Sequence, residues 1–372
     1  MRAPITVVAV LILLASLTAC SPTGPSPSAN PSVFEIAMSE LRQTSGVSEA
    51  NLEVVESRHY VALDVLLNGD VSPEDLEKIG ALVVRFTSLA DDGGYESAAP
   101  QLTLEKSNYS YFAGVSDDQL TSQLNYWLAL VRTGAEAVSV RSYQPTAVAA
   151  YSGVSATTTA DPSRYVLLDL PNGLNREDRG ELIGALANVP DPGAAAGQWD
   201  VLDLATSTKA EYVGPNFPER DRMRADADTA DLFAQVPGLA SIEVRRDDSA
   251  TTPLLVQIVV FDDAMDSLET AKAEDAFAKT DAYGQLHELL RLLESRTADP
   301  YGVDLLSSPL TDGGNFHLWF DVHGCEFNSD TQWPRLSNEL GATWISVLNP
   351  DRRGGATNSE HCTVNGEHPP RP

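Results

Sequence analysis

The chain has 372 residues, of which 42% are hydrophobic and 21% are charged. This is ordinary globular usage and argues against a collagen-like, coiled-coil or wholly disordered protein. Its 53 Asp and Glu residues outnumber its 25 Lys and Arg residues, for a formal net charge of -28, so we expect no nucleic-acid partner, because such binders need a basic surface to neutralise phosphates.

Residues 1–19 predict a signal peptide, in which Arg2 precedes an apolar run from Ile5 to Leu17 and small residues lead to Cys20. The segment resembles the signal of bacterial lipoproteins, whose lipobox matches Leu17-Thr18-Ala19-Cys20. The resemblance implies cleavage before Cys20, lipidation of that cysteine, palmitate included, and a protein anchored by lipid to the extracytoplasmic face of the cell membrane. The alternative is an uncleaved anchor, but the apolar stretch falls short of the ~20 residues that cross a bilayer.

Residues 20–32 predict a flexible tether, because residues 21–32 are rich in Pro and Ser and carry no charge. The chain contains 20 Arg and only 5 Lys, a bias that resembles GC-rich actinobacterial coding sequences. The mature body resembles no family that its residues identify.

An internal repeat organises the body. The segment from Tyr60 to Val65 recurs as Tyr165 to Leu170, Asn68-Gly69 recurs as Asn172-Gly173, and Ile79 to Leu82 recurs as Ile183 to Leu186. The offset is 104 or 105 residues. Each copy predicts a strand, a turn and a helix, and three matches in register indicate a repeated unit.

Helix-start signals support this pattern. Ser72 is followed by Pro73 and, three residues on, by Asp75, and Asn175 is followed by Asp178 at the same spacing. Both patterns are typical of helix N-caps. A third helix is expected from Ser116, where Gln119 completes a capping box.

The remaining elements follow the same order in each copy. A leading helix, Val33 to Gln43, and a strand, Leu52 to Glu56, are expected to extend the first unit. The first unit continues with strands Gln101–Lys106 and Tyr109–Ala113, separated by a turn at Ser107-Asn108, and closes with a strand from Glu136 to Tyr143. The second unit has strands Trp199–Leu204, Ala210–Val213 and Leu239–Arg246 and a helix from about Glu219 to Val236. The third has strands Leu254–Phe261, Gly302–Leu306, Phe316–Val322 and Thr343–Leu348, a long helical stretch from Ser267 to Glu294 and a helix near Thr331–Leu340.

The predicted fold is therefore α+β, with three tandem ferredoxin-like (βαββαβ) units, each an antiparallel sheet with its helices on one face. We place the units at residues 33–146, 160–247 and 253–372. The last unit ends in a tail that a disulfide is expected to hold.

With Cys20 lipidated, Cys325 and Cys362 form an even pair outside the cytoplasm, and we expect a disulfide between them. One alternative is tetrahedral zinc, with His323 and His361 supplying imidazoles beside the two thiolates. A weaker alternative keeps the disulfide and leaves the two histidines as a metal site by themselves.

No motif in the chain specifies a reaction. The Gly-x-Ser-x-Gly, His-Glu-x-x-His, Ser-x-x-Lys and glycine-rich phosphate-loop patterns do not occur. We expect no cofactor and assign no catalytic residue. A catalytic site built from residues distant in sequence stays open as an alternative.

Several acidic groups could bind calcium, but none has the spacing of a calcium loop, and we favour helix N-termini and solvated surface for them. They are Asp117-Asp118, Asp226 with Asp228 and Asp231, and Asp262-Asp263 with Asp266 and Glu269. Asp64 and Asp169 occupy matching strand positions, for which we prefer outward-facing positions over a shared acidic site.

The leading hypothesis is a membrane-tethered, non-catalytic binding or scaffold lipoprotein, whose partner is a protein or ligand of the cell envelope. The alternatives are a hydrolytic enzyme that uses scattered carboxylates and histidines, and a carrier of metal or a small molecule. Aromatic residues on predicted strands would indicate a peptide or glycan surface only where they are exposed on the helix-free sheet face. They are Tyr109, Tyr111, Phe112, Phe316, Trp319 and Phe320.

Overall fold

The computed structural model describes residues 33–97, 99–111, 115–143, 163–194, 197–203, 206–261, 270–297, 299–308, 316–348 and 362–367. The predicted signal peptide, the tether, Cys20 and His361 lie outside these residues. No helix among the described residues is long and apolar enough to cross a membrane.

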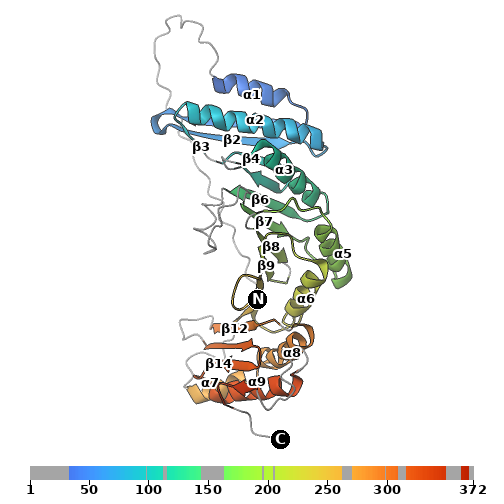
Figure 1. Ribbon diagram of the computed structural model, residues 1–372, viewed down its shortest axis with the longest axis vertical. Coiled ribbons are helices and arrows are strands. Elements are labelled where there is room, and N and C mark those ends of the chain that lie inside the picture. Colours follow the sequence, from blue (N-terminus) through green and yellow to red (C-terminus); the bar gives the residue numbers. More distant parts are fainter. Residues whose placement is uncertain are drawn as a thin grey trace, which may run out of the picture.

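The first part of the chain alternates strands and helices (Figure 1). Its elements are α1 (Val33–Gln43), β1 (Val47–Val55), a short 3-10 turn (Glu56–Arg58), β2 (Tyr60–Leu67), α2 (Pro73–Asp92), β3 (Glu96–Ser97), β4 (Gln101–Leu104), β5 (Ser107–Ser110), α3 (Asp117–Val131) and β6 (Ala137–Tyr143). The expected caps form: the side chain of Ser72 accepts from the backbone of Asp75, and Ser116 and Gln119 make a complete capping box.

The middle part repeats the order. Its elements are β7 (Ser163–Asp169), α5 (Arg176–Ala187), β8 (Gly197–Asp203), β9 (Thr208–Gly214), α6 (Arg220–Asp231) and β10 (Leu239–Asp247). Asn175 caps α5 as Ser72 caps α2. The prediction that Tyr60–Leu82 and Tyr165–Leu186 form the same strand, turn and helix is confirmed.

The last part differs most from expectation. Its elements are β11 (Leu254–Phe261), α7 (Thr270–Phe277), α8 (Asp281–Arg296), β12 (Tyr301–Ser308), β13 (Phe316–His323), β14 (Glu326–Ser329), α9 (Pro334–Val347) and β15 (Thr363–Val364).

Three predicted elements need correction. Thr343–Leu348 is largely helical, because Leu336, Leu340 and Trp344 recur at helical spacing and are buried against the core. The long helical stretch divides where Thr280 caps α8. The turn expected at Ser107-Asn108 lies two residues earlier, where Glu105 has a φ of 54°.

The described strands form one continuous fifteen-stranded sheet, in which β3 pairs with β2 and the other strands follow chain order. Strands joined through a helix pair in parallel, as β2 does with β4 and β7 does with β8. Strands joined directly pair antiparallel. The coarse prediction of a mixed fold of helices and sheet is confirmed.

The ferredoxin-like strand order is not confirmed. That order would place the first and third strands of a unit side by side, whereas β4 pairs with β2 and with β5. The last strand of one unit also pairs with the first strand of the next, as β6 does with β7 and β10 does with β11. Sharing edges in this way satisfies backbone groups that separate sheets would leave unpaired.

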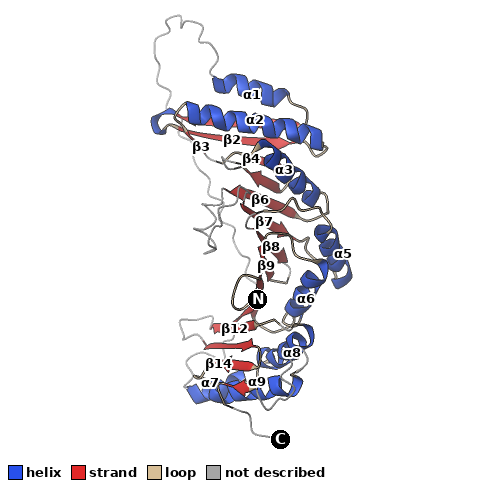
Figure 2. Ribbon diagram, in the orientation of Figure 1, coloured by secondary structure: helices blue, strands red, loops and turns tan. Residues whose placement is uncertain are grey.

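The helices that the structure describes lie on one face of the sheet, on the outer side of its curve (Figure 2). The connections β2-α2-β4 and β5-α3-β6 both move in the same direction across the sheet. The strands of the second connection run opposite to those of the first, because β4 and β5 are antiparallel. The connections β2-α2-β4 and β5-α3-β6 therefore have opposite hands, and one of them departs from the right-handed rule.

The buried side chains divide into two hydrophobic clusters, which follow each other along the sheet. The first extends from Phe34 to Met223 and the second from Ala230 to Cys362. The division falls within α6, where polar side chains replace apolar ones between the helix layer and the sheet.

Candidate functional site

The face of the sheet opposite the helices, called here the bare face, presents the candidate functional residues. Strand alternation assigns the two faces: in β13, Phe316, Leu318, Phe320 and Val322 are buried under helices, whereas His317 and Trp319 are exposed. Register partners on neighbouring strands point to the same face, so the pairing identifies the residues of the bare face on each strand in turn. One row across it consists of Leu167, Asp200, Glu211, Arg245, Leu255, Gly302, Asp321 and Asn328.

An ionic network occupies the middle of the bare face. Nζ of Lys209 lies 3.2 Å from Oδ2 of Asp200, 2.8 Å from Oε2 of Glu211 and 3.4 Å from Oε1 of Glu243. Nε of Arg245 lies 3.2 Å from Oε1 of Glu211. The hydroxyl of Tyr165 donates to Asp200 at 2.9 Å. Three carboxylates thus share two cations.

The pKa shifts follow from this arrangement. Burial disfavours the charged form of Lys209, but the hydrogen bond to Glu211 and the three carboxylates outweigh it and raise its pKa. Burial raises the pKa of Glu243; Lys209 opposes this rise and Glu211 adds to it. Burial and the charge of Asp200 raise the pKa of Tyr165. Lys209 therefore stays charged at neutral pH and holds the network together.

An exposed tryptophan lies among carboxylates nearer the C-terminal end of the bare face. Trp319 is 37% exposed, directly across from Asp304 on β12. Asp321 is two residues along the same strand, and the backbone of Asp330 donates to the carbonyl of Trp319. Nε2 of His317 lies 2.6 Å from Asp304. This group, called here the Trp319 patch, combines an aromatic face with negative charge.

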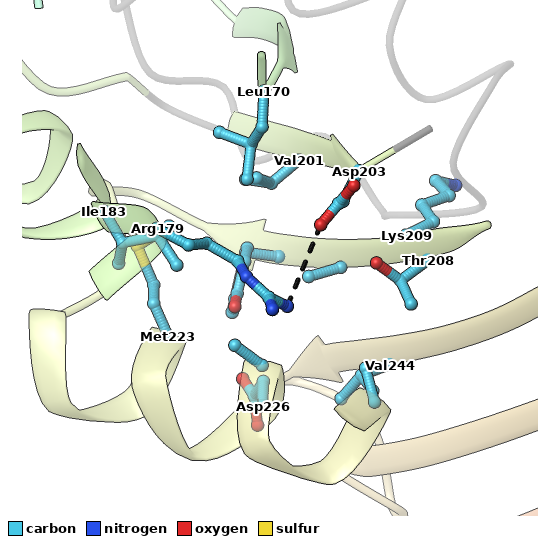
Figure 3. A pocket seen from close by; sticks show the side chains of 14 residues that line it. Leu170, Arg179, Ile183, Val201, Asp203, Thr208, Lys209, Met223, Asp226 and Val244 are labelled. Carbon is cyan, nitrogen blue, oxygen red and sulfur yellow. Dashed lines mark ion pairs between the residues drawn. The ribbon is translucent and has the colours of Figure 1, made fainter. Parts of the chain in front are cut away.

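A second polar site lies on the helix side, between α5, α6 and strands β8 to β10 (Figure 3). Arg179 extends from α5 into a cavity and lies 3.8 Å from Oδ2 of Asp203. Its Nη1 donates to Asp231 at 2.8 Å, whereas its Nε is buried with no hydrogen-bond partner among the described residues. Met223 and Ile183 supply apolar walls.

Asp226 closes the lower side of this cavity (Figure 3). It is 1% exposed and accepts from Nε and Nη2 of Arg246 at 2.6 to 2.9 Å. The hydroxyl of Tyr212 also bonds to it, and burial followed by the charge of Asp226 raises the pKa of Tyr212 well above its ordinary value.

The size of the cavity limits its chemistry. It measures about 30 Å³, which accommodates a water molecule near the unpartnered Nε of Arg179 but no organic substrate. Its charged groups already neutralise one another. The site is therefore suited to joining α5 and α6 to the sheet.

The acidic clusters considered for calcium have other roles. Asp226 pairs with Arg246, Asp228 with Arg176 and Arg296, and Asp231 with Arg179. Because each carboxylate has an arginine partner, this cluster is not organised for calcium. Asp117 and Asp118 begin α3, where they favourably meet the helix dipole. The cluster around Asp262 lies outside the described residues.

The structure brings Cys325 and Cys362 together at disulfide distance, with Cα atoms 4.6 Å apart. His323 is nearby on β13, where its Nε2 lies 3.3 Å from the hydroxyl of Thr252. His361 lies outside the described residues. Within the described part of the chain, no three His, Cys, Asp or Glu side chains form a group that could hold a metal ion.

Asp64 and Asp169 do not form a shared site. Four strand-to-strand steps separate β2 from β7, which corresponds to ~19 Å. Both residues lie on the bare face, as expected. Asp169 is half-buried, and burial with the charge of Glu136 raises its pKa.

Of the aromatic residues considered for a binding surface, Trp319 alone meets the stated condition within the described chain. Tyr109, Tyr111, Phe316 and Phe320 are buried, and Phe112 lies outside the described residues. Sequence reasoning missed the Lys209 network. The sequence does show charged residues at alternate positions, Lys209 and Glu211 on one strand and Glu243 and Arg245 on another. Only the pairing of β9 with β10 shows that these four side chains lie next to one another.

Comparisons with known proteins give no relative. No family model, no curated protein and no solved structure matches this chain. The functional argument therefore rests on the chain's own residues.

Proposed function

We propose that this protein is a lipid-anchored, non-catalytic binding protein on the extracytoplasmic face of the cell membrane. It holds a partner protein by a basic segment that docks on the bare face of the sheet. The observation that carries this proposal is the Trp319 patch, an exposed aromatic ring with Asp304 across from it and Asp321 two residues along its strand, on the sheet face that no described helix covers.

The chemistry of the patch favours a cationic partner. A guanidinium or ammonium over an indole gains cation–π attraction, and an adjacent carboxylate adds a charge-assisted hydrogen bond. Asp304 lies across from Trp319, and Asp321 lies along the same strand. The negative net charge of the chain attracts a basic partner to the molecule as a whole.

The N-terminus supports the anchor. Cleavage before Cys20 removes one basic residue and leaves 24 basic residues against 53 acidic ones, a net charge of 24 - 53 = -29. The uncharged residues 21–32 would hold the body up to ~35 Å from the bilayer. At that distance anionic lipid is largely screened from the acidic body.

The repeated order of elements supports a body of three tandem units, at residues 33–146, 160–247 and 253–372. Matching caps at Ser72 and Asn175 support the equivalence of the first two units. The units share one sheet and thereby extend the bare face. A long curved surface suits a partner that contacts several units at once.

The rival functions have weaker support. A hydrolase needs room for substrate beside catalytic groups that are free to react. The cavity between Arg179 and Asp226 measures about 30 Å³. The larger depression beside it, about 550 Å³, has the carboxylates of Asp228 and Asp231 in its lining, and both are already paired with arginines. A metal carrier needs a ligand group, and Cys325 and Cys362 stand at disulfide distance instead.

The test uses purified full-length protein and an eight-residue arginine peptide, with an eight-residue glutamate peptide as the charge control. We expect the arginine peptide to bind and its affinity to fall with added salt. Trp319→Ala should raise the dissociation constant of the arginine peptide about tenfold, because it removes a cation–π contact together with the packing of the indole ring. Phe261→Ala is the matched control, because Phe261 is also a large aromatic residue exposed on the bare face.

Two results would contradict the proposal. One is equal loss of affinity in the Trp319 and Phe261 variants, which would indicate nonspecific attraction. The other is binding of a neutral oligosaccharide with no binding of the arginine peptide, which would make the patch a glycan site. Crosslinking on intact cells, with the Trp319→Ala protein as control, then identifies the partner.

A further inference from the structure

A cavity of about 250 Å³ lies at the carboxyl ends of parallel strands β11 and β12. Val260 and Ser307 are register partners near those ends, and both line the cavity. The start of α8 forms another wall through Thr280 and Ala282. In open sheets with helical connections, ligands bind outside the carboxyl ends of parallel strands, near helix N-termini. This cavity occupies such a position.

Ser307 is an independent sign of a ligand. It is 1% exposed, and its hydroxyl is buried with no hydrogen-bond partner in the described structure. A buried hydroxyl without a partner costs free energy, so each one in a native protein needs an explanation. The neighbouring hydroxyl of Thr280 differs from it, because it donates its proton to the carbonyl of Phe277 and accepts from the amide of Tyr283.

The electrostatics favour an anion with one charge. The 16-residue helix α8 presents the partial positive charge of its N-terminus. Thr280 caps the amide of Tyr283, which leaves the amides of Asp281 and Ala282 without a helical acceptor. Lys279 adds a cation, and the exposed carboxylate of Asp281 at the rim opposes a second negative charge on the ligand.

The rest of the lining is apolar. Val236, Val260, Phe277 and Ala282 are buried side chains that line the cavity. We propose that this cavity binds a small monocarboxylate with a short apolar body, whose carboxylate meets Ser307, Lys279 and the start of α8. This inference is independent of the Trp319 patch, because the cavity lies on the other side of the sheet from the bare face.

Calorimetric titration of the purified full-length protein tests the proposal, with 3-methylbutanoate as the probe and its neutral amide, 3-methylbutanamide, as the charge control. We expect saturable binding of one carboxylate per chain, and binding of the amide at least about tenfold weaker. Ser307→Ala and Lys279→Gln should each weaken carboxylate binding about fivefold or more. Lys78→Gln, a distant exposed lysine on α2, is the matched control and should bind as the wild type does.

A second measurement separates a ligand-binding role of Ser307 from a structural one. The thermal midpoint of ligand-free Ser307→Ala should equal or exceed that of the wild type, since the substitution removes an unpartnered buried hydroxyl. The proposal is overturned by no binding at ~10 mM carboxylate, by equal affinity for acid and amide, by tighter binding of inorganic phosphate, or by wild-type affinity in both cavity variants.

Discussion

Arg164 and Asp191 form a buried ion pair at the junction of the first two repeats. Nη2 of Arg164 lies 2.6 Å from Oδ1 and 2.8 Å from Oδ2 of Asp191, and the arginine side chain is fully buried. The guanidinium carbon lies 4.5 Å from the ring centre of Tyr126 and 5.3 Å from that of Trp199. The pair thus joins α3, β7 and β8 through one cation.

Asp191→Ala should therefore lower the free energy of unfolding by about 3–5 kcal/mol, because it leaves a buried guanidinium without its counter-charge. Urea unfolding measures the change. Asp92→Ala, an exposed residue at the end of α2, should change stability by no more than ~0.5 kcal/mol. Equal effects of the two substitutions would mean that the ion pair does not hold this junction.

Trp319 should report its electrostatic surroundings in a fluorescence experiment. The other four tryptophans are buried, so a water-soluble quencher acts mainly on Trp319. The carboxylates around it should make cationic Cs⁺ a more effective quencher than anionic iodide. Trp319→Phe should abolish most quenching by both ions. More effective quenching by iodide would contradict the acidic character assigned to the patch.

His287 should make stability depend on pH. It lies between α8 and α9, with Nδ1 2.7 Å from the hydroxyl of Thr343. Burial, and then the charge of Arg291, lowers its pKa below 6.5, against a smaller opposing effect of Glu339. Near and below pH 6.5, His287 binds a proton more readily in the unfolded chain than in the folded one. The stability that neutral His287 contributes is therefore lost as the pH falls from 6.5 through the pKa of His287 in the folded protein.

His287→Gln should consequently flatten the pH dependence of the unfolding free energy below pH 6.5, by no more than the uptake of one proton. Urea unfolding from pH 5 to 8 measures it. His59→Gln is the control, because His59 is exposed and makes no ion pair with a carboxylate among the described residues. An unchanged slope in the His287 variant would exclude this linkage.

The pair Cys325 and Cys362 should be a disulfide. Under denaturing, non-reducing conditions the protein should show no free thiol on this pair, and reduction should release two. Reduction should also lower the free energy of unfolding by ~4 kcal/mol on the loop-entropy model, for a separation of 37 residues. Two thiols released by a chelator without reductant, with one zinc per chain, would establish the zinc alternative with His323 and His361.

The lipid anchor is tested at Cys20. Cys20→Ala removes the thiol that we propose accepts the lipid, so labelling with a fatty-acid probe in cells should disappear and the proposed signal peptide should stay uncleaved. Wild-type protein and a Ser21→Ala variant serve as controls. Equal labelling of the Cys20 variant would remove the lipoprotein assignment.

The sequence by itself determined the local elements. Helix α2 and its counterpart α5 were predictable because Ser72 and Asn175 are caps whose hydrogen bonds reach only three residues ahead. The same local logic placed β2, β7 and α3. It failed at Thr343–Leu348, where β-branched residues suggest a strand but packing of Trp344 against the core keeps the helix.

Only the tertiary structure decided how the strands pair. Whether β4 pairs with β5 alone or also with β2 depends on hydrogen bonds between strands distant in sequence, and each strand's composition suits several neighbours. Strand pairing in turn decided the sites. The alternation of side chains along β13 places Trp319 and Phe320 on opposite faces of the sheet. Only the packing of the helices decides which face they cover, and it leaves Trp319 exposed and Phe320 buried. The Lys209 network and the Ser307 cavity likewise exist only because register brings β8 to β10, and β11 to β12, side by side.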